Sequence, residues 1–179
     1  MPDLLKLSID RIPTPIGELL LVVDEAGNLR ALDWADYEER MLRLLRLHYG
    51  PGGFRLQPAV NPHGLRDLIN RYFGGDIAAL DGISVKTGGT PFQRSVWREL
   101  RNIPKGSVIS YGTLAGQIAR PKAVRAVGLA NGSNPIGIVV PCHRVIGSNG
   151  SLTGYGGGLE RKQWLLKHEQ KHVRSASNV

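Results

Sequence analysis

Three short segments rich in apolar residues lie near the start of the chain, at residues 5–9, 18–23 and 29–34, and the first of them alternates apolar with polar positions. Short segments of this kind bounded by turn residues are typical of strands, and the turn residues between them, such as Ala26-Gly27-Asn28, favour a hairpin or meander. Apolar residues at helical spacing then predict helices at residues 38–49 and 64–73, and glycines end both helices. A short strand is predicted at residues 83–86. We therefore expect an α/β domain with a small antiparallel sheet and helices in the first half.

The second half of the chain is predicted to form mainly short helices. Thr90 and Gln93 match a capping box, with Pro91 at the first helical position, so we expect a helix to start at Pro91. Further helices are predicted at residues 111–119, 122–130 and 159–169. Two short helices joined by a tight turn in a basic half resemble a helix-turn-helix. Polar and basic residues from Gln170 onwards predict a flexible tail.

Charge divides the chain at Thr87-Gly88-Gly89, which we interpret as the linker. Residues 1–88 hold ten Lys/Arg against twelve Asp/Glu, a net charge of −2, whereas residues 89–179 hold thirteen against three, a net charge of +10. The predicted domains are residues 1–88 and 89–170, followed by the tail at 171–179. Such asymmetry indicates a polyanionic partner for the second domain, nucleic acid before a membrane surface, because no amphipathic anchor helix accompanies it.

Composition is that of an ordinary globular protein, with 41% hydrophobic and 21% charged residues in 179. The chain does not open with a basic segment followed by an apolar run, and no apolar stretch reaches the length of a membrane span. We therefore expect neither secretion nor membrane insertion. The single cysteine excludes an intramolecular disulfide, which fits a protein of the reducing cytoplasm.

That cysteine, Cys142, lies in Pro141-Cys142-His143-Arg144-Val145, between apolar residues. Pro141 fixes its own φ and biases the residue before it towards an extended conformation, so the thiol is expected on a stiff turn. A lone cysteine is most often an inert buried residue, and on this motif alone that interpretation is favoured. A nucleophilic thiol needs a basic partner, for which His143 is a candidate.

The predicted helix at residues 122–130 is unusual for a helix that reads the major groove. It has small residues and one central arginine, Arg125, instead of several long polar side chains. Ala123, Ala126 and Gly128 would let its backbone approach a narrow groove, while Arg125 could replace an extruded base. The same small residues would also allow close helix packing inside the domain.

The chain resembles the O6-alkylguanine-DNA alkyltransferases in a series of features that follow one another in the same order. These are Arg125, Asn134-Pro135, the Pro-Cys-His-Arg-Val motif, Tyr155 and Glu169. The similarity is close over roughly residues 90–169 and looser before them. It implies a ribonuclease H-like α/β N-terminal domain and a mainly α, winged-helix-like C-terminal domain that contains the helix-turn-helix. It also implies direct-reversal DNA repair by a single-turnover methylated-DNA–protein-cysteine S-methyltransferase that acts after base flipping.

The resemblance implies a role for each matching residue. Cys142 would attack the alkyl carbon on O6 of guanine and keep the group, while Glu169 orients His143, which deprotonates the thiol through a water molecule. Tyr111 would donate a proton to the leaving guanine, and Asn134 would brace the active-site turn. The remaining implied contacts are with substrate and DNA. Arg125 would be the finger, the side chain that fills the space of the extruded base. The base pocket would be formed by Val145, Tyr155 and Gly156, and the DNA-binding helix would contribute Ala123, Val124, Ala126 and Gly128.

The implied partner is double-stranded DNA, approached through the minor groove by a monomer; cooperative binding along DNA and activity on O4-alkylthymine stay open. No cofactor is implied. Some relatives hold a structural zinc in the N-terminal domain, but this chain lacks the cysteines for it, so we predict no metal. Two other interpretations stay open: a DNA-binding or regulatory module without chemistry, and a cysteine hydrolase.

Overall fold

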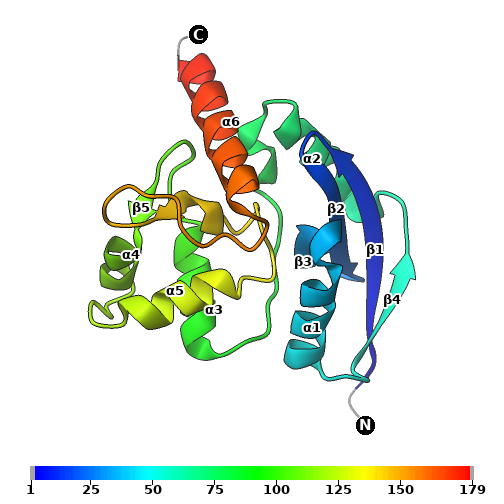
Figure 1. Ribbon diagram of the computed structural model, residues 1–179. Coiled ribbons are helices and arrows are strands. Elements are labelled where there is room, and N and C mark those ends of the chain that lie inside the picture. Colours follow the sequence, from blue (N-terminus) through cyan, green and yellow to red (C-terminus); the bar gives the residue numbers. More distant parts are fainter. Residues whose placement is uncertain (1–2, 178–179) are drawn as a thin grey trace. The chain divides into compact units, whose positions relative to one another are not determined.

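The computed structural model describes residues 3–177, and its contacts divide the chain into two compact units, Met1–Gly89 and Thr90–Val179. Figure 1 shows strands gathered in the first unit and helices in the second. The predicted linker at residues 87–89 ends at this division. An α/β unit and a mainly helical unit are thus both present, as the sequence indicates.

The first unit is built on a four-stranded sheet with the order β3-β2-β1-β4. Its strands are β1 (Leu5–Thr14), β2 (Gly17–Asp24), β3 (Leu29–Trp34) and β4 (Phe54–Pro58). The first three are antiparallel neighbours, as predicted from the hairpin pattern, but β4 pairs parallel to β1. The sheet is therefore mixed, and the predicted antiparallel sheet is wrong at this edge.

Helices of the first unit pack on this sheet because they present an apolar stripe to it. Helix α1 (Glu38–Tyr49) buries Met41 and Leu45 in one cluster with Leu20 and Val22 of β2. Helix α2 (Leu65–Phe73) follows, and 3₁₀ turns lie at η1 (Ala35–Tyr37), η2 (Pro62–Gly64) and η3 (Ile77–Leu80). The strand predicted at residues 83–86 is wrong, because Val85 makes only an isolated bridge to Leu29.

The second unit contains the helices α3 (Pro91–Leu100), α4 (Tyr111–Gln117), α5 (Val124–Gly132) and α6 (Leu159–Ser177). The predicted capping box of α3 is present: Thr90 Oγ1 accepts from the Gln93 backbone N–H at 3.1 Å, and Gln93 Oε1 accepts from the Thr90 N–H at 3.0 Å. Helices α3, α4 and α5 pack against one another, and Trp97 Nε1 of α3 donates to the Ala130 carbonyl of α5 at 2.8 Å.

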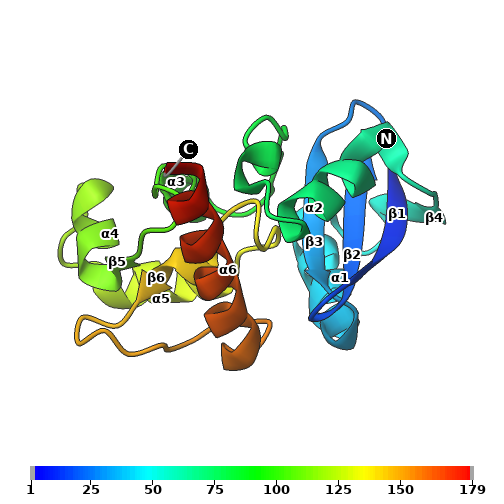
Figure 2. The same ribbon diagram turned by 90° about the horizontal axis from the view of Figure 1, so that it is seen from above.

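Several predicted helix boundaries in this unit are wrong: α4 ends at Gln117 instead of residue 119, and α5 ends at Gly132 instead of residue 130. Helix α5 begins at Val124 instead of Lys122, because Pro121 and Lys122 form a turn, and Ala123 is the N-cap. Helix α6 does not end at Glu169 but continues to Ser177, so residues 171–177 of the predicted flexible tail are helical; residues 178 and 179 lie outside the described part. Its long course is visible in Figures 1 and 2.

Candidate active site

The segment between α5 and α6 carries Cys142 at the start of a 3₁₀ turn, η4 (Cys142–Arg144). Two short parallel strands, β5 (Ile109–Ser110) and β6 (Val145–Ile146), adjoin this turn. The residues before and after it are apolar and buried, and Cys142 itself is 7% exposed. Cys142 is therefore buried and lies on a turn, and a turn at this position is what Pro141 predicts.

Asn134 holds this turn from the end of α5. Its Nδ2 donates to the Val140 carbonyl at 2.8 Å, and its Oδ1 accepts from the Ile136 N–H at 2.9 Å. A side chain that both donates to and accepts from one backbone segment fixes the shape of that segment. The contact lies two residues before Cys142, where a brace on the active-site turn was predicted.

The centre of the site is a buried cluster of three charged or titratable side chains from η4 and α6. His143 Nε2 and Glu169 Oε2 are 2.9 Å apart, and both residues are fully buried. Arg144 donates through Nε to Glu169 Oε1 at 2.8 Å and through a terminal nitrogen to Oε2 at 3.0 Å. A second terminal nitrogen donates to the Ile103 carbonyl at 2.9 Å, so the guanidinium is held in place.

These partners decide the charge of Glu169. Burial alone would raise the pKa of its carboxyl, but the charge and hydrogen bond of His143, followed by those of Arg144, hold the pKa far below its usual range. The carboxylate is therefore ionised at neutral pH. It can stabilise a positive charge on the His143 ring, which is the property that a general base needs after it takes up a proton.

The second ring nitrogen of His143 has a different environment. Nδ1 is buried and has no hydrogen-bond partner among residues 3–177, and the same holds for Oδ1 of Asn131. Because Nε2 is held by the carboxylate, Nδ1 is the ring atom that remains able to accept a proton. Asn131 lies near Cys142 as well, since its Nδ2 donates to the Cys142 carbonyl at 3.4 Å.

Lys162 is a further buried charge beside the cysteine turn. Its side chain is fully buried, and Nζ donates to the carbonyls of Val145 at 2.6 Å and Thr153 at 2.7 Å. Burial lowers the pKa of Lys162, and the charge of an ionised Cys142 opposes that shift. Lys162 therefore joins the strand after Cys142 to the glycine-rich loop at residues 153–158, and it brings a positive charge near the sulfur.

The sequence analysis assigned no role to Arg144, Asn131 or Lys162, although Arg144 belongs to the Pro-Cys-His-Arg-Val motif. A signal for Lys162 was present, because residues 162, 165, 166 and 169 follow the i, i+3, i+4, i+7 spacing of one helix face. Leu165 and Leu166 are buried, so this face of α6 points into the core. Its two charged members, Lys162 and Glu169, are therefore brought to the site by the same periodicity that buries the leucines.

Tyr111 begins α4 and contacts the glycine-rich loop. Its hydroxyl donates to the Thr153 carbonyl at 3.3 Å, the same oxygen that accepts from Lys162. Tyr155 and Gly156 follow in that loop and are half-buried. The Thr153 carbonyl thus joins Tyr111 to Lys162, and Lys162 in turn joins this loop to Val145.

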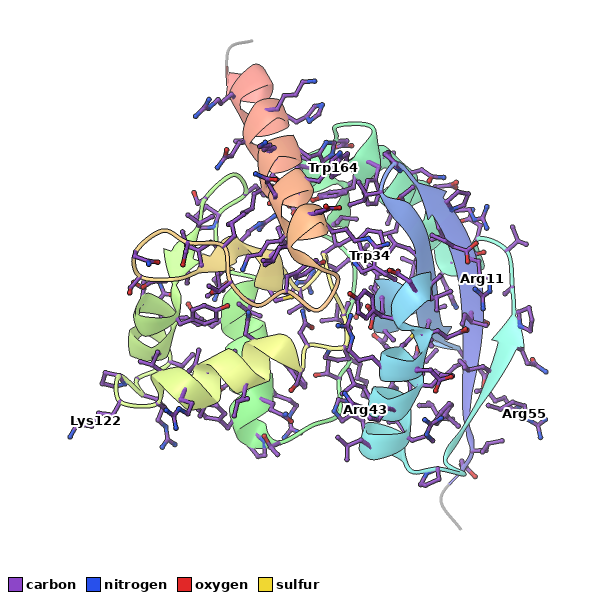
Figure 3. The ribbon with its side chains drawn as sticks, viewed as in Figure 1. Arg11, Trp34, Arg43, Arg55, Lys122 and Trp164 are labelled. Atoms are coloured by element: carbon purple, nitrogen blue, oxygen red, sulfur yellow. The ribbon has the colours of Figure 1, made fainter. Side chains whose placement is uncertain are left out.

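The predicted DNA-binding residues lie on α5 and the turn before it. Val124, Arg125 and Ala126 are exposed, and Lys122 points outward from the turn in Figure 3. Gly128 lies against Tyr111, where an added Cβ would be 3.9 Å from Cδ1 of the ring. Gly128 therefore packs against α4, whereas the outer surface near Arg125 is open.

Among residues 3–177 there is neither a candidate metal site nor a helix that could span a membrane. No group of three or more His, Cys, Asp or Glu side chains has an arrangement that could hold a metal ion. No helix has both the length and the apolar composition to cross a membrane.

The second unit matches a known family model. The model describes the DNA-binding domain of 6-O-methylguanine DNA methyltransferases, and the match covers residues 91–171. It begins at the first residue of α3 and ends within α6, so it contains the cysteine turn and the buried cluster. The unit that carries the candidate site therefore matches the DNA-binding domain of these methyltransferases.

Relatives extend the similarity to both units. The methylated-DNA–protein-cysteine methyltransferase of Shigella flexneri is 55% identical over 166 residues, 93% of this chain and 97% of that protein. The protein of the same name from Mycobacterium tuberculosis strain H37Rv is 45% identical over 162 residues, 90% of this chain and 92% of its own length. This chain belongs to the methylated-DNA–protein-cysteine methyltransferase family.

Solved structures agree with this assignment. The crystal structure of the Mycobacterium tuberculosis O6-methylguanine methyltransferase has a TM-score of 0.75 at 40% identity, covering 93% of this chain and 94% of that one. A structure of the Mycobacterium tuberculosis protein OGT in complex with DNA has a TM-score of 0.74 at 39% identity, with 92% and 94% coverage. The O6-methylguanine-DNA methyltransferase of Pyrococcus kodakaraensis has a TM-score of 0.66 at 30% identity, with 91% and 98% coverage.

Proposed function

We propose that this protein repairs O6-alkylguanine in duplex DNA by a single, irreversible transfer of the alkyl group to Cys142. The observation that carries the proposal is the position of the only cysteine, directly before a buried histidine that is paired with a carboxylate. Family membership supplies the reaction class, because the relatives are named for transfer from methylated DNA to a protein cysteine. The product is a stable thioether, so each molecule reacts once.

The proton and electron balance of the transfer can be assigned to named atoms. The thiol proton of Cys142 passes through a water molecule to Nδ1 of His143, and Glu169 stabilises the resulting imidazolium. The Sγ–carbon bond forms as the carbon–O6 bond breaks, and the electron pair of that bond goes to the guanine. The support for this path is that Nε2 of His143 is held by Glu169 while Nδ1 has no partner among the described residues.

Tyr111 then supplies a proton to the leaving guanine. A guanine anion in a pocket with little water is unfavourable, so a phenol placed against it stabilises the transition state more than the substrate. The hydroxyl of Tyr111 donates to the Thr153 carbonyl, on the loop that carries Tyr155 and Gly156. We propose that this loop, together with Val145, forms the wall beside the flipped base.

Helix α5 is the proposed DNA-binding element. A guanine inside a duplex cannot reach a cysteine that is 7% exposed, so the base has to leave the stack. We propose that α5 enters the minor groove, that Val124 and Ala126 lie against it with Ala123 at the N-cap, and that Arg125 fills the space of the extruded base. Gly128 would contribute by letting α5 lie close to Tyr111. A DNA complex of the Mycobacterium tuberculosis relative is consistent with duplex binding.

The finer description of the fold is also a proposal. We propose that the first unit is ribonuclease H-like and that the second is winged-helix-like, with α4 and α5 as its helix-turn-helix. The packing of α4 on α5 and the parallel pair of β5 and β6 support the second assignment. We further propose that the protein acts as a monomer in the cytoplasm, where its lone thiol stays reduced.

Intact-mass measurement after incubation with an O6-methylguanine duplex tests the proposed function. The expected result is the gain of one methyl group by the wild-type protein and no gain by Cys142→Ser, with an undamaged duplex as the control. Duplex binding without a mass gain would support a binding module instead. Repeated turnover of ester or amide substrates would support a cysteine hydrolase.

A further inference from the structure

Ile138 has a backbone conformation that is unusual for its side chain. Its φ is +69°, and of the four non-glycine residues with positive φ among residues 3–177 it is the β-branched one. In the left-handed region the Cβ atom crowds the backbone, and for a β-branched residue such a conformation is a genuine outlier. Outliers of this kind persist only where the surrounding structure imposes them, and they cluster at functional sites.

The hydrogen bonds around Ile138 define two tight turns in succession. The Val139 N–H donates to the Gly137 carbonyl at 2.8 Å, which makes Ile138 the centre of a three-residue γ-turn with positive φ, the rare and strained form. The Cys142 N–H donates to the Val140 carbonyl at 2.8 Å across Pro141, whose φ of −82° and ψ of 66° are those of the common inverse γ-turn. The backbone thus bends twice immediately before the cysteine.

Contacts on both sides hold this double turn. The Val140 carbonyl accepts from the Cys142 N–H and also from Nδ2 of Asn134, and the Val140 N–H donates to the Ile136 carbonyl at 3.1 Å. The side chain of Ile138 is 2% exposed. Burial of this hydrophobic side chain offsets the strain of the left-handed backbone.

We infer that Ile138 is a positioning residue for alkyl transfer, and that its strained γ-turn fixes the direction in which Cys142 is presented. The inference rests on the proposed role of Cys142 as alkyl acceptor. Glycine at this position would relieve the strain, because it adopts positive φ without a Cβ clash, but it would also admit many other conformations. Relief of strain and loss of positioning should therefore occur together.

Comparison of Ile138→Gly with Ile138→Ala isolates the strain, since the two variants lose the buried side chain alike and differ only in the Cβ atom. In a residue with negative φ, alanine is the more stabilising of the two. At Ile138 we expect the opposite order, with a higher urea midpoint for Ile138→Gly. Although it should be more stable than Ile138→Ala, Ile138→Gly should transfer the alkyl group at least about tenfold more slowly than wild type at saturating duplex. Its duplex affinity should be unchanged, because the change displaces the nucleophile from its alignment and does not alter the DNA-binding surface.

Two further variants serve as controls. Ile138→Val keeps the β-branched side chain and should retain the wild-type transfer rate within about twofold, because backbone path and burial are preserved. His63→Gly relieves a positive φ of 55° at an exposed position of the first unit. It should raise the urea midpoint and leave the transfer rate unchanged.

A higher midpoint for Ile138→Ala than for Ile138→Gly would overturn the inference, as would failure of Ile138→Gly to fold while Ile138→Ala folds. A wild-type rate in Ile138→Gly would overturn it too, and so would an equal loss of rate in Ile138→Val. If the wild-type protein accepts no alkyl group, the proposed function fails instead. The order of the two midpoints still reports on the strained turn in that case.

Discussion

Replacing Glu169 with glutamine would remove the one negative charge of the buried cluster while preserving its shape. The carboxylate faces three N–H groups at 2.8–3.0 Å, one on His143 and two on Arg144. An amide offers one acceptor oxygen and turns an NH₂ group towards donors, so at least one buried hydrogen bond is lost and the guanidinium has no counter-charge. Breaking a buried ion pair in this way costs about 3–5 kcal/mol.

Urea unfolding at pH 7 measures this cost, with Glu160→Gln as a matched control. Glu160 lies in the first turn of the same helix and is exposed, so its replacement should change the free energy of unfolding by no more than about 1 kcal/mol. Glu169→Gln should also transfer methyl groups more slowly, because the imidazolium of His143 is no longer stabilised. Equal losses of stability in the two variants, or a wild-type transfer rate in Glu169→Gln, would refute the assigned role of the cluster.

Three further outcomes are expected. The folded-state pKa of Glu169 is depressed, so the stabilisation by its carboxylate should be present above the unfolded-state pKa of about 4.3 and be lost as the pH falls from there towards the folded-state pKa. The difference in unfolding free energy between wild type and Glu169→Gln should therefore shrink below about pH 4. Lys162→Met should move the pH–rate profile of alkyl transfer to higher pH, because a positive charge near Cys142 is removed, and an unshifted profile would exclude that electrostatic role. Arg125→Ala should slow repair in duplex DNA about tenfold or more while leaving the reaction with a free O6-alkylguanine base unchanged, and equal losses on both substrates would remove the finger role.

Local sequence signals predicted the elements whose causes are local. The start of α3 follows from Thr90, Pro91 and Gln93, which satisfy the first backbone N–H groups without help from the rest of the chain. The extent of α1 was predicted in full, because its apolar stripe and the glycines after it are both visible in the sequence.

Elements that depend on distant partners were missed. Strand β4 has a weak pattern of its own and forms through parallel pairing with β1, some fifty residues earlier in the chain. The last part of α6 is polar and basic, which favoured a tail, but a helix that is already nucleated can continue through residues of good helical propensity.

The candidate site was predicted unevenly for a related reason. The resemblance named Cys142, His143 and Glu169, and the structure brings the last two into contact. Arg144 and Lys162 were not assigned roles, because long charged side chains are expected at the surface. Their burial depends on acceptors that the fold supplies from elsewhere, namely Glu169 and the carbonyls of the cysteine turn and the glycine-rich loop. Such acceptors cannot be identified from a single sequence.

The central claim is that one sulfur atom accepts one alkyl group and keeps it. Peptide mass mapping after incubation with a tenfold excess of O6-methylguanine duplex tests it most directly. Our account predicts one S-methylated residue, Cys142, in every protein molecule, with an equal number of restored guanines in the DNA. Methylation at any other residue, or more restored guanines than protein molecules, would contradict it.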